Sequence, residues 1–91
     1  MAKTLSIVKH QVNDYAAWRA VYDEVQPLRD SFGVIDASVL QDADDKNSVT
    51  VLHWFPSTEQ AEGFASSPDL KAAMGRAGVA AAPRIELVVE A

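Results

Sequence analysis

Hydrophobic and polar residues alternate with a period of two in four short segments of this chain, and that period is typical of half-buried β-strands. The four segments are residues 4–10, 34–41, 48–55 and 84–90. Residues 42–47, Asp-Ala-Asp-Asp-Lys-Asn, separate the second segment from the third and are rich in turn formers. We therefore expect residues 34–41 and 48–55 to pair as a β-hairpin.

A long helical pattern lies between the first two strands. It begins after Asn13, a suitable N-cap, and ends before Gly33. Pro27 lies inside it and removes one backbone donor, so we expect the helix to kink or to start again there. Its apolar positions recur at helical spacing: Tyr15, Trp18, Tyr22, Val25 and Phe32.

A second, broken helical region follows the hairpin. Ser57, with Gln60 three residues later, is a capping-box pattern and predicts a helix to about Ala65. Ser67-Pro68-Asp69 supplies a cap, a first-turn proline and an acidic first turn. These residues predict another short helix that ends near Gly78.

The order of elements is strand, helix, strand, strand, broken helix, strand. Two split crossovers in one antiparallel sheet predict an α+β, ferredoxin-like fold, with the first and third strands in the centre of a four-stranded sheet and the helices on one face. A chain of 91 residues has room for a single domain, which we place at residues 1–91.

Strand parity divides the predicted sheet into two faces. One is apolar, includes His53 and should lie under the helices: Leu5, Ile7, Ile35, Ala37, Val39, Val49, Val51, Phe55, Ile85, Leu87 and Val89. The other mixes apolar and polar side chains: Val8, His10, Leu40, Leu52, Trp54 and Val88 among Ser6, Asp36, Ser38, Thr50, Glu86 and Glu90. This second face is too apolar to remain in water, so we expect another surface to cover it.

Composition narrows the possible partners. The chain has 13 acidic and 8 basic residues and a net charge of -5, which disfavours binding to nucleic acid. Nothing in the sequence resembles a membrane span or a signal peptide, so we expect no membrane association. The absence of cysteine suits a cytoplasmic location and leaves no thiolate for catalysis or metal binding.

His10 and His53 are the only histidines. On neighbouring central strands they should lie roughly 10 Å or more apart and point to opposite faces, so we expect no metal site. His53, on the helix-facing side, is a candidate general base or hydrogen-bond donor. The alternative is a core histidine whose hydrogen bonds are satisfied.

Arg29 is the second catalytic candidate. At about 100° per residue it falls within the apolar arc of the first helix, so on a straight helix it would project toward the sheet. A buried arginine must be paired or must face a wet cavity, which suggests an anchor for a carboxylate or enolate. Alternatively, Pro27 rotates the last turns and lets Arg29 reach solvent or pair with an acidic side chain.

Large apolar side chains on the helices are the candidate walls of a ligand site: Trp18, Tyr22, Phe64 and Met74. They are core residues by default. If a cavity exists between the helices and the sheet, they also line it.

Two stretches carry a family resemblance that spans nearly the whole chain. They are His-Gln-Val-Asn-Asp-Tyr-Ala-Ala-Trp at residues 10–18 and Ala-Ser-Ser-Pro-Asp-Leu-Lys-Ala-Ala-Met-Gly-Arg-Ala-Gly at residues 65–78. Both are similar to segments of the dimeric alpha-beta barrel proteins, the superfamily of the antibiotic-biosynthesis monooxygenases and of many small bacterial monooxygenase-like or cyclase-like proteins. The resemblance implies a homodimer with sheets packed face to face and a ligand cavity in each subunit. Because strand parity places His10 on the outer face, we expect it at the dimer interface or the barrel rim.

The resemblance also bears on cofactors. Haem-degrading relatives carry a ligating His in the second helical region and an Asn early in the first strand. Here residues 57–77 contain no His and residues 1–10 contain no Asn. We expect no haem, metal or flavin.

Three functions remain open at this stage. The first is a cofactor-independent monooxygenase, isomerase or cyclase that acts on a small aromatic or polyketide-like compound. The second is a dimer that binds a small aromatic or anionic ligand without chemistry. The third is an accessory dimer with a filled core.

Overall fold

Eight elements make up the computed structural model, which describes residues 2–80 and 82–91. They are β1 (Thr4–Gln11), α1 (Tyr15–Glu24), α2 (Gln26–Ser31), β2 (Asp36–Gln41), β3 (Ser48–Phe55), α3 (Thr58–Ala65), α4 (Pro68–Ala77) and β4 (Arg84–Val89). Of the domain expected at 1–91, residues 1 and 81 lie outside the described residues.

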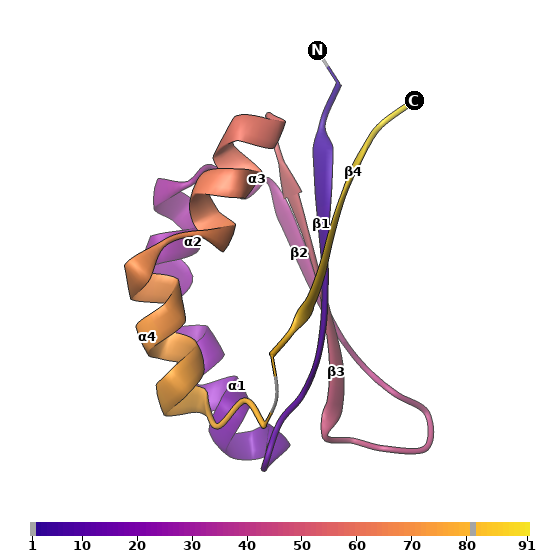
Figure 1. Cartoon of the computed structure of the whole chain (residues 1–91), viewed down its shortest axis with the longest axis vertical. Helices are drawn as coiled ribbons and strands as arrows, with labels where there is room; N and C mark the ends of the chain where they lie inside the picture. The colour runs from indigo at the N-terminus through magenta and orange to yellow at the C-terminus, as the bar shows by residue number, and fades with distance from the viewer. Residues whose placement is uncertain (1, 81) are drawn as a thin grey trace.

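The four strands form one antiparallel sheet in the order β2-β3-β1-β4. The predicted hairpin and the predicted central pair, β1 and β3, are both confirmed. The helices cover one face of the sheet and leave the other open (Figure 1). This is the α+β, ferredoxin-like arrangement expected from the order of elements.

Local sequence chemistry sets most of the helix ends. Pro27 lies in the first turn of α2, and Val25 separates α2 from α1, so the expected re-initiation is confirmed. The N-cap of α1 is wrong by one residue: the carboxylate of Asp14 accepts a hydrogen bond from the backbone N–H of Ala17 at 3.0 Å. Asn13 instead donates its backbone N–H to the carbonyl of Gly78.

The caps of the second helical region are confirmed. Ser57 accepts a hydrogen bond from the backbone N–H of Gln60, and Ser67 caps α4. Gly78 ends α4 with a φ of 76°, in the left-handed region that glycine adopts without strain.

The prediction for β1 is wrong about its faces. Ser6 is paired with His53, and Val8 is paired with Val51, both of which point toward the helices. The helix-facing side of β1 therefore carries Thr4, Ser6, Val8 and His10, whereas Leu5 and Ile7 face the other way. The assignments for β3 and for Ala37 and Val39 in β2 agree with the register. Three predicted core residues near the sheet edges, Ile35, Ile85 and Val89, remain 42% to 56% exposed.

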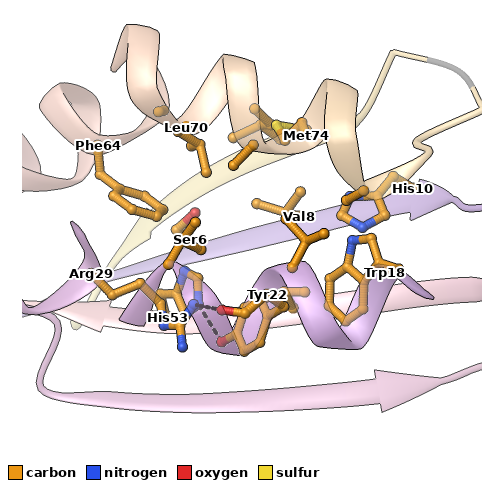
Figure 2. A pocket seen from close by; sticks show the side chains of 17 residues that line it. Ser6, Val8, His10, Trp18, Tyr22, Arg29, His53, Phe64, Leu70 and Met74 are labelled. Atoms are coloured by element: carbon orange, nitrogen blue, oxygen red, sulfur yellow. Dashed lines mark hydrogen bonds between the residues drawn. The ribbon is translucent and has the colours of Figure 1, made fainter. Parts of the chain in front are cut away.

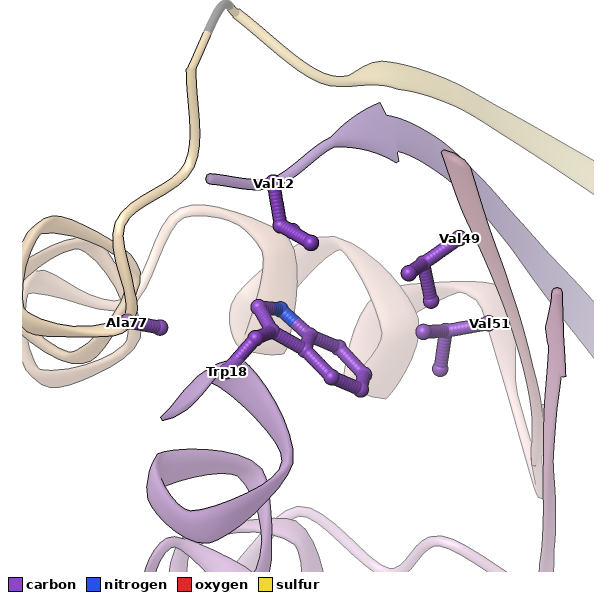
Figure 3. Packing of buried hydrophobic residues seen from close by; sticks show 5 residues of the cluster. All are labelled: Val12, Trp18, Val49, Val51 and Ala77. Carbon is purple, nitrogen blue, oxygen red and sulfur yellow. The ribbon is translucent and has the colours of Figure 1, made fainter. Parts of the chain in front are cut away.

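Two clusters of buried side chains hold the helices on the sheet. One lies at the β1–α1 end and comprises Val12, Trp18, Val49, Val51 and Ala77 (Figure 3). The other comprises Phe55, Ala61 and Phe64.

The uncovered face of the sheet is apolar along its centre. Leu5 lies between Trp54 and Val88 across the strands, and Ile7 is paired with Leu52. Val88 is 43% exposed, and the other four are only partly buried. None of the helices in residues 2–80 and 82–91 is long and apolar enough to cross a membrane.

Candidate functional site

A half-open cavity of about 80 Å³ lies between the helices and the inner face of the sheet. Figure 2 shows the side chains that surround it. All six residues selected from the sequence line it: Trp18, Tyr22, Arg29, His53, Phe64 and Met74. Their roles in binding or catalysis stay predictions, but the fold brings them together around one space.

Aromatic rings form one apolar wall. Trp18 stacks on Tyr22, with ring centroids 5.0 Å apart and planes at 19°. Both residues come from α1, one turn apart, because the i and i+4 positions of a helix share a face. Phe64 and Met74, from α3 and α4, line the cavity from the other helix pair.

Tyr22 and His53 form the polar centre of the site. The Tyr22 hydroxyl lies 2.9 Å from Nε2 of His53, and the two rings are stacked at 6.0 Å. Burial, followed by the positive charge of Arg29, lowers the pKa of His53 to about 4. The imidazole is therefore neutral at pH 7. Its Nδ1 is buried without a hydrogen-bond partner among the described residues.

Burial has the opposite effect on Tyr22. It raises the pKa of the phenol, and the nearby charges of Arg29 and Arg19 offset this only in part. The hydroxyl is therefore protonated at pH 7. Because the hydroxyl both donates and accepts, the Tyr22–His53 bond forms with either neutral tautomer of the imidazole.

Arg29 is buried against Tyr22. It is 7% exposed, its guanidinium lies 3.8 Å from the centre of the Tyr22 ring, and its Nη1 donates to the main-chain carbonyl of Tyr22. Within the described part of the chain, no carboxylate lies within ion-pair distance of it. The alternative in which Pro27 turns Arg29 toward solvent or an acidic partner is therefore wrong.

A second, more polar hollow borders the same arginine. Tyr22 and Arg29 line both the cavity and this hollow, which also contains Arg19, Asp23 and Asp30. Arg29 thus forms part of the wall between an apolar space and a polar one. Such a position makes guanidinium donors available to an anion in the cavity.

The expectation that His10 and His53 point to opposite faces of the sheet is wrong. His10 faces the helices, on the same side as His53, and it packs on Trp18 with centroids 5.5 Å apart. His10 is paired with Val49 and His53 with Ser6, so four residues, or about 13 Å of strand, separate the two histidines. In residues 2–80 and 82–91 no three His, Cys, Asp or Glu side chains are grouped closely enough to hold a metal ion.

Three lining residues of β1 were missed by sequence reasoning: Ser6, Val8 and His10. The period-two pattern correctly placed them on one side of β1, but the prediction assigned that side to the outer face of the sheet instead of the helix-facing one. Because Ser6 and His10 are polar, the sequence favoured the outer, solvent-facing side of the sheet for these residues.

Several solved structures share the fold over almost their full length. A Bordetella bronchiseptica protein assigned to the antibiotic biosynthesis monooxygenases has a TM-score of 0.84 and 13% identity, with 100% of this chain and 99% of that chain covered. A Chloroflexus aurantiacus protein with the same assignment has a TM-score of 0.73 and 22% identity, with 98% and 93% covered. SnoaB, a cofactor-independent oxygenase from Streptomyces nogalater, has a TM-score of 0.76 and 13% identity, with 94% and 90% covered.

Comparison with functionally curated proteins finds no match. The family model described as antibiotic biosynthesis monooxygenase matches residues 13–76, which is well over half of the chain and runs from the start of α1 into the last turns of α4. Together with the sheet order and the position of the helices, this match identifies the chain as a member of the antibiotic biosynthesis monooxygenase family.

Proposed function

We propose that this protein is a cofactor-independent monooxygenase that binds a small aromatic or polyketide-like anion in the cavity. One observation carries the proposal: Arg29 is a buried cation with no carboxylate partner in the described residues, and it lies beside a neutral histidine. A buried charge is costly unless an opposite charge or water meets it. An anionic ligand would supply that charge.

The walls of the cavity suit a flat ring. Trp18 and Tyr22 offer aromatic faces, and Phe64 offers another ring from α3. Rings of this kind bind aromatic ligands through stacking and edge contacts. The guanidinium of Arg29 meets the ligand's charge, while the rings meet its apolar body.

The chemistry assigned to the polar residues is proton removal and anion stabilisation. The ligand's phenolic hydroxyl gives its proton to an imidazole nitrogen of His53, and Arg29 stabilises the resulting anion. Because the charge of Arg29 is one cause of the low pKa of His53, an anion at Arg29 raises that pKa and makes His53 a stronger base.

The substrate itself supplies the electrons. A phenol and one dioxygen give a quinone and one water: one oxygen atom forms the new carbonyl at a ring carbon, and the other leaves as water with the two hydrogens that the phenol loses. This balance requires no flavin, haem or metal. SnoaB, whose fold this chain shares, is a cofactor-independent oxygenase.

We further propose that the protein acts in the cytoplasm as a homodimer. The apolar centre of the outer sheet face would lie between the two sheets: Leu5, Ile7, Leu52, Trp54 and Val88. The cavity then lies on the other side of each sheet, under the helices.

Binding is tested with 2-naphthoate, an aromatic anion, by calorimetric titration of the wild type and two arginine variants. Arg29→Gln should weaken binding about tenfold or more, because it removes a charge-assisted contact. Arg19→Gln is the matched control, since Arg19 is exposed and already paired with Asp23. Equal effects of the two substitutions would contradict an anion site at Arg29.

Catalysis is tested separately with 1-naphthol, by dioxygen uptake and by formation of 1,4-naphthoquinone, both corrected for the reaction without protein. The monooxygenase proposal expects uptake that His53→Ala abolishes. Binding of 2-naphthoate without uptake would favour the second candidate, a non-catalytic ligand-binding dimer.

A further inference from the structure

Two buried residues on the inner face of β1 carry hydroxyl groups, and only one of these hydroxyls is paired. Thr4 is 0% exposed, and its hydroxyl lies 2.7 Å from that of Thr58 in α3. Ser6 is 3% exposed, and its side chain makes no hydrogen bond within residues 2–80 and 82–91. Thr4 does not line the cavity, whereas Ser6 does.

Ser6 lies next to the polar centre of the site. It is the cross-strand partner of His53 on the inner face, which places the two Cβ atoms about 5 Å apart. Figure 2 shows its hydroxyl directed away from the sheet into the space below α3 and α4. Its second cross-strand neighbour is Leu87, which offers no hydrogen-bonding side chain.

The Ser6 hydroxyl is open to the cavity and is not sealed in the core. Among the described residues, the buried side-chain atoms without a hydrogen-bond partner are Nδ1 and Nε2 of His10 and Nδ1 of His53, and the Ser6 oxygen is not one of them. A polar group that lines a cavity and has no partner in the protein is free to bind a polar atom of a ligand.

We propose that Ser6 is a specificity-determining residue that hydrogen-bonds a neutral oxygen of the ligand, a hydroxyl or a carbonyl, while the ligand's anionic group lies at Arg29. This inference rests on the function proposed above. A serine hydroxyl both donates and accepts, so it pairs with either kind of oxygen. The ligand class is thus an aromatic anion with a second oxygen substituent on the same ring system.

The test compares three probes on wild type and Ser6→Ala by calorimetry: 2-naphthoate, 3-hydroxy-2-naphthoate and 6-hydroxy-2-naphthoate. The two hydroxyl positions sample two spacings from the carboxylate. The wild type should bind one hydroxylated probe about tenfold or more tightly than 2-naphthoate, because a site with a polar group for an oxygen discriminates against analogues that lack it. Ser6→Ala should reduce that preference to less than about threefold and leave the affinity for 2-naphthoate within about twofold.

Thr4→Val is the matched control, because it removes a buried hydroxyl that is already paired and lies outside the cavity. It should lower the melting temperature and keep the probe preference. Ser6→Ala should leave the melting temperature close to that of the wild type, since the hydroxyl opens onto the cavity and has no partner in the protein. A melting temperature that falls as far as that of Thr4→Val would assign Ser6 a structural role and overturn the proposal.

The remaining outcomes separate the two proposals. If Arg29→Gln weakens binding of 2-naphthoate but Ser6→Ala keeps the preference, only the role of Ser6 is wrong. A wild type that binds all three probes equally also refutes Ser6 alone. If the wild type binds none of them, the anion site at Arg29 fails, and the inference for Ser6 fails with it.

Discussion

The hydroxyl of Tyr22 lies 2.9 Å from Nε2 of His53, and this bond joins α1 to the central strand β3 directly under the cavity. The other ring nitrogen of His53 has no partner among the described residues. The bond to Tyr22 therefore orients this neutral imidazole together with the edge-on contacts of Phe55 and Phe64.

Tyr22→Phe should destabilise the fold. It leaves both ring nitrogens of His53 buried and unpaired, which costs about 1–3 kcal/mol of unfolding free energy. Urea unfolding at pH 7 measures this change. Tyr15→Phe is the control, because the Tyr15 hydroxyl accepts a hydrogen bond from the exposed Arg19, and its loss should cost less than about 0.5 kcal/mol. A smaller effect for Tyr22→Phe than for the control would contradict this account.

The low pKa of His53 predicts a fold that weakens in mild acid. The pKa is about 4 in the folded protein and 6.5 in an ordinary histidine, so the unfolded chain takes up the proton first as the pH falls. The unfolding free energy that depends on a neutral His53 is fully present above about pH 6.5. It is lost as the pH falls from 6.5 to 4, and the total loss is about 3 kcal/mol.

This dependence is measured by urea unfolding across that window on the wild type and His53→Leu. Burial lowers the pKa of His10 as well, so His10 adds to the slope in the same direction in both proteins. The difference between the two slopes isolates His53. Parallel curves would show that His53 is not the titrating group.

Arg29→Met should raise the pKa of His53. The charge of Arg29 is the smaller of the two causes that lower this pKa, and burial is the larger. Without the charge, the pKa should therefore rise above about 4 but remain below 6.5. Titration of the imidazole proton signals by NMR reports it, with Arg19→Met as the exposed control. An unchanged pKa would mean that Arg29 and His53 do not interact.

The outer face of the sheet should form the dimer interface, and β1 allows a sharp test. Ile7→Asp places a charge on the outer face opposite Leu52, so it should shift the protein from dimer to monomer while it stays folded. Val8→Asp places the same charge inside the fold, beside Val51, and should unfold the chain.

Light scattering at micromolar concentration distinguishes these outcomes, with circular dichroism as the check on folding. Trp54→Asp should behave as Ile7→Asp does. A wild type of single-chain mass, or a dimer that both outer-face charges leave intact, would contradict an interface on this face.

The sequence determined the elements and their order because their signals are local. Caps at Ser57 and Ser67, the proline that restarts α2 and the left-handed glycine at position 78 each act within one helical turn. The strands show an equally local period-two pattern. These contacts form between neighbours in the chain, so composition and spacing were enough to predict them, with an error of one residue at Asp14.

Only the tertiary structure decided which side of β1 faces inward. Alternation shows that Leu5 and Ile7 share one side and Ser6, Val8 and His10 the other, but a one-residue change in pairing exchanges the two faces. The apolar character of Leu5 and Ile7 did not identify the inner side, because both faces of this sheet are partly apolar. In addition, the inner face borders a cavity that is lined in part by polar groups. The pairing of Ser6 with His53 shows which side of β1 faces the helices and brings Ser6 into the site. The break before Pro27 leaves Arg29 buried over the ring of Tyr22. The pairing of Ser6 with His53 joins strands that are far apart in the chain, and no local pattern specifies contacts of that range. Helical spacing had already placed Arg29 on the same arc as Tyr22, but only the structure shows that the break before Pro27 keeps it there.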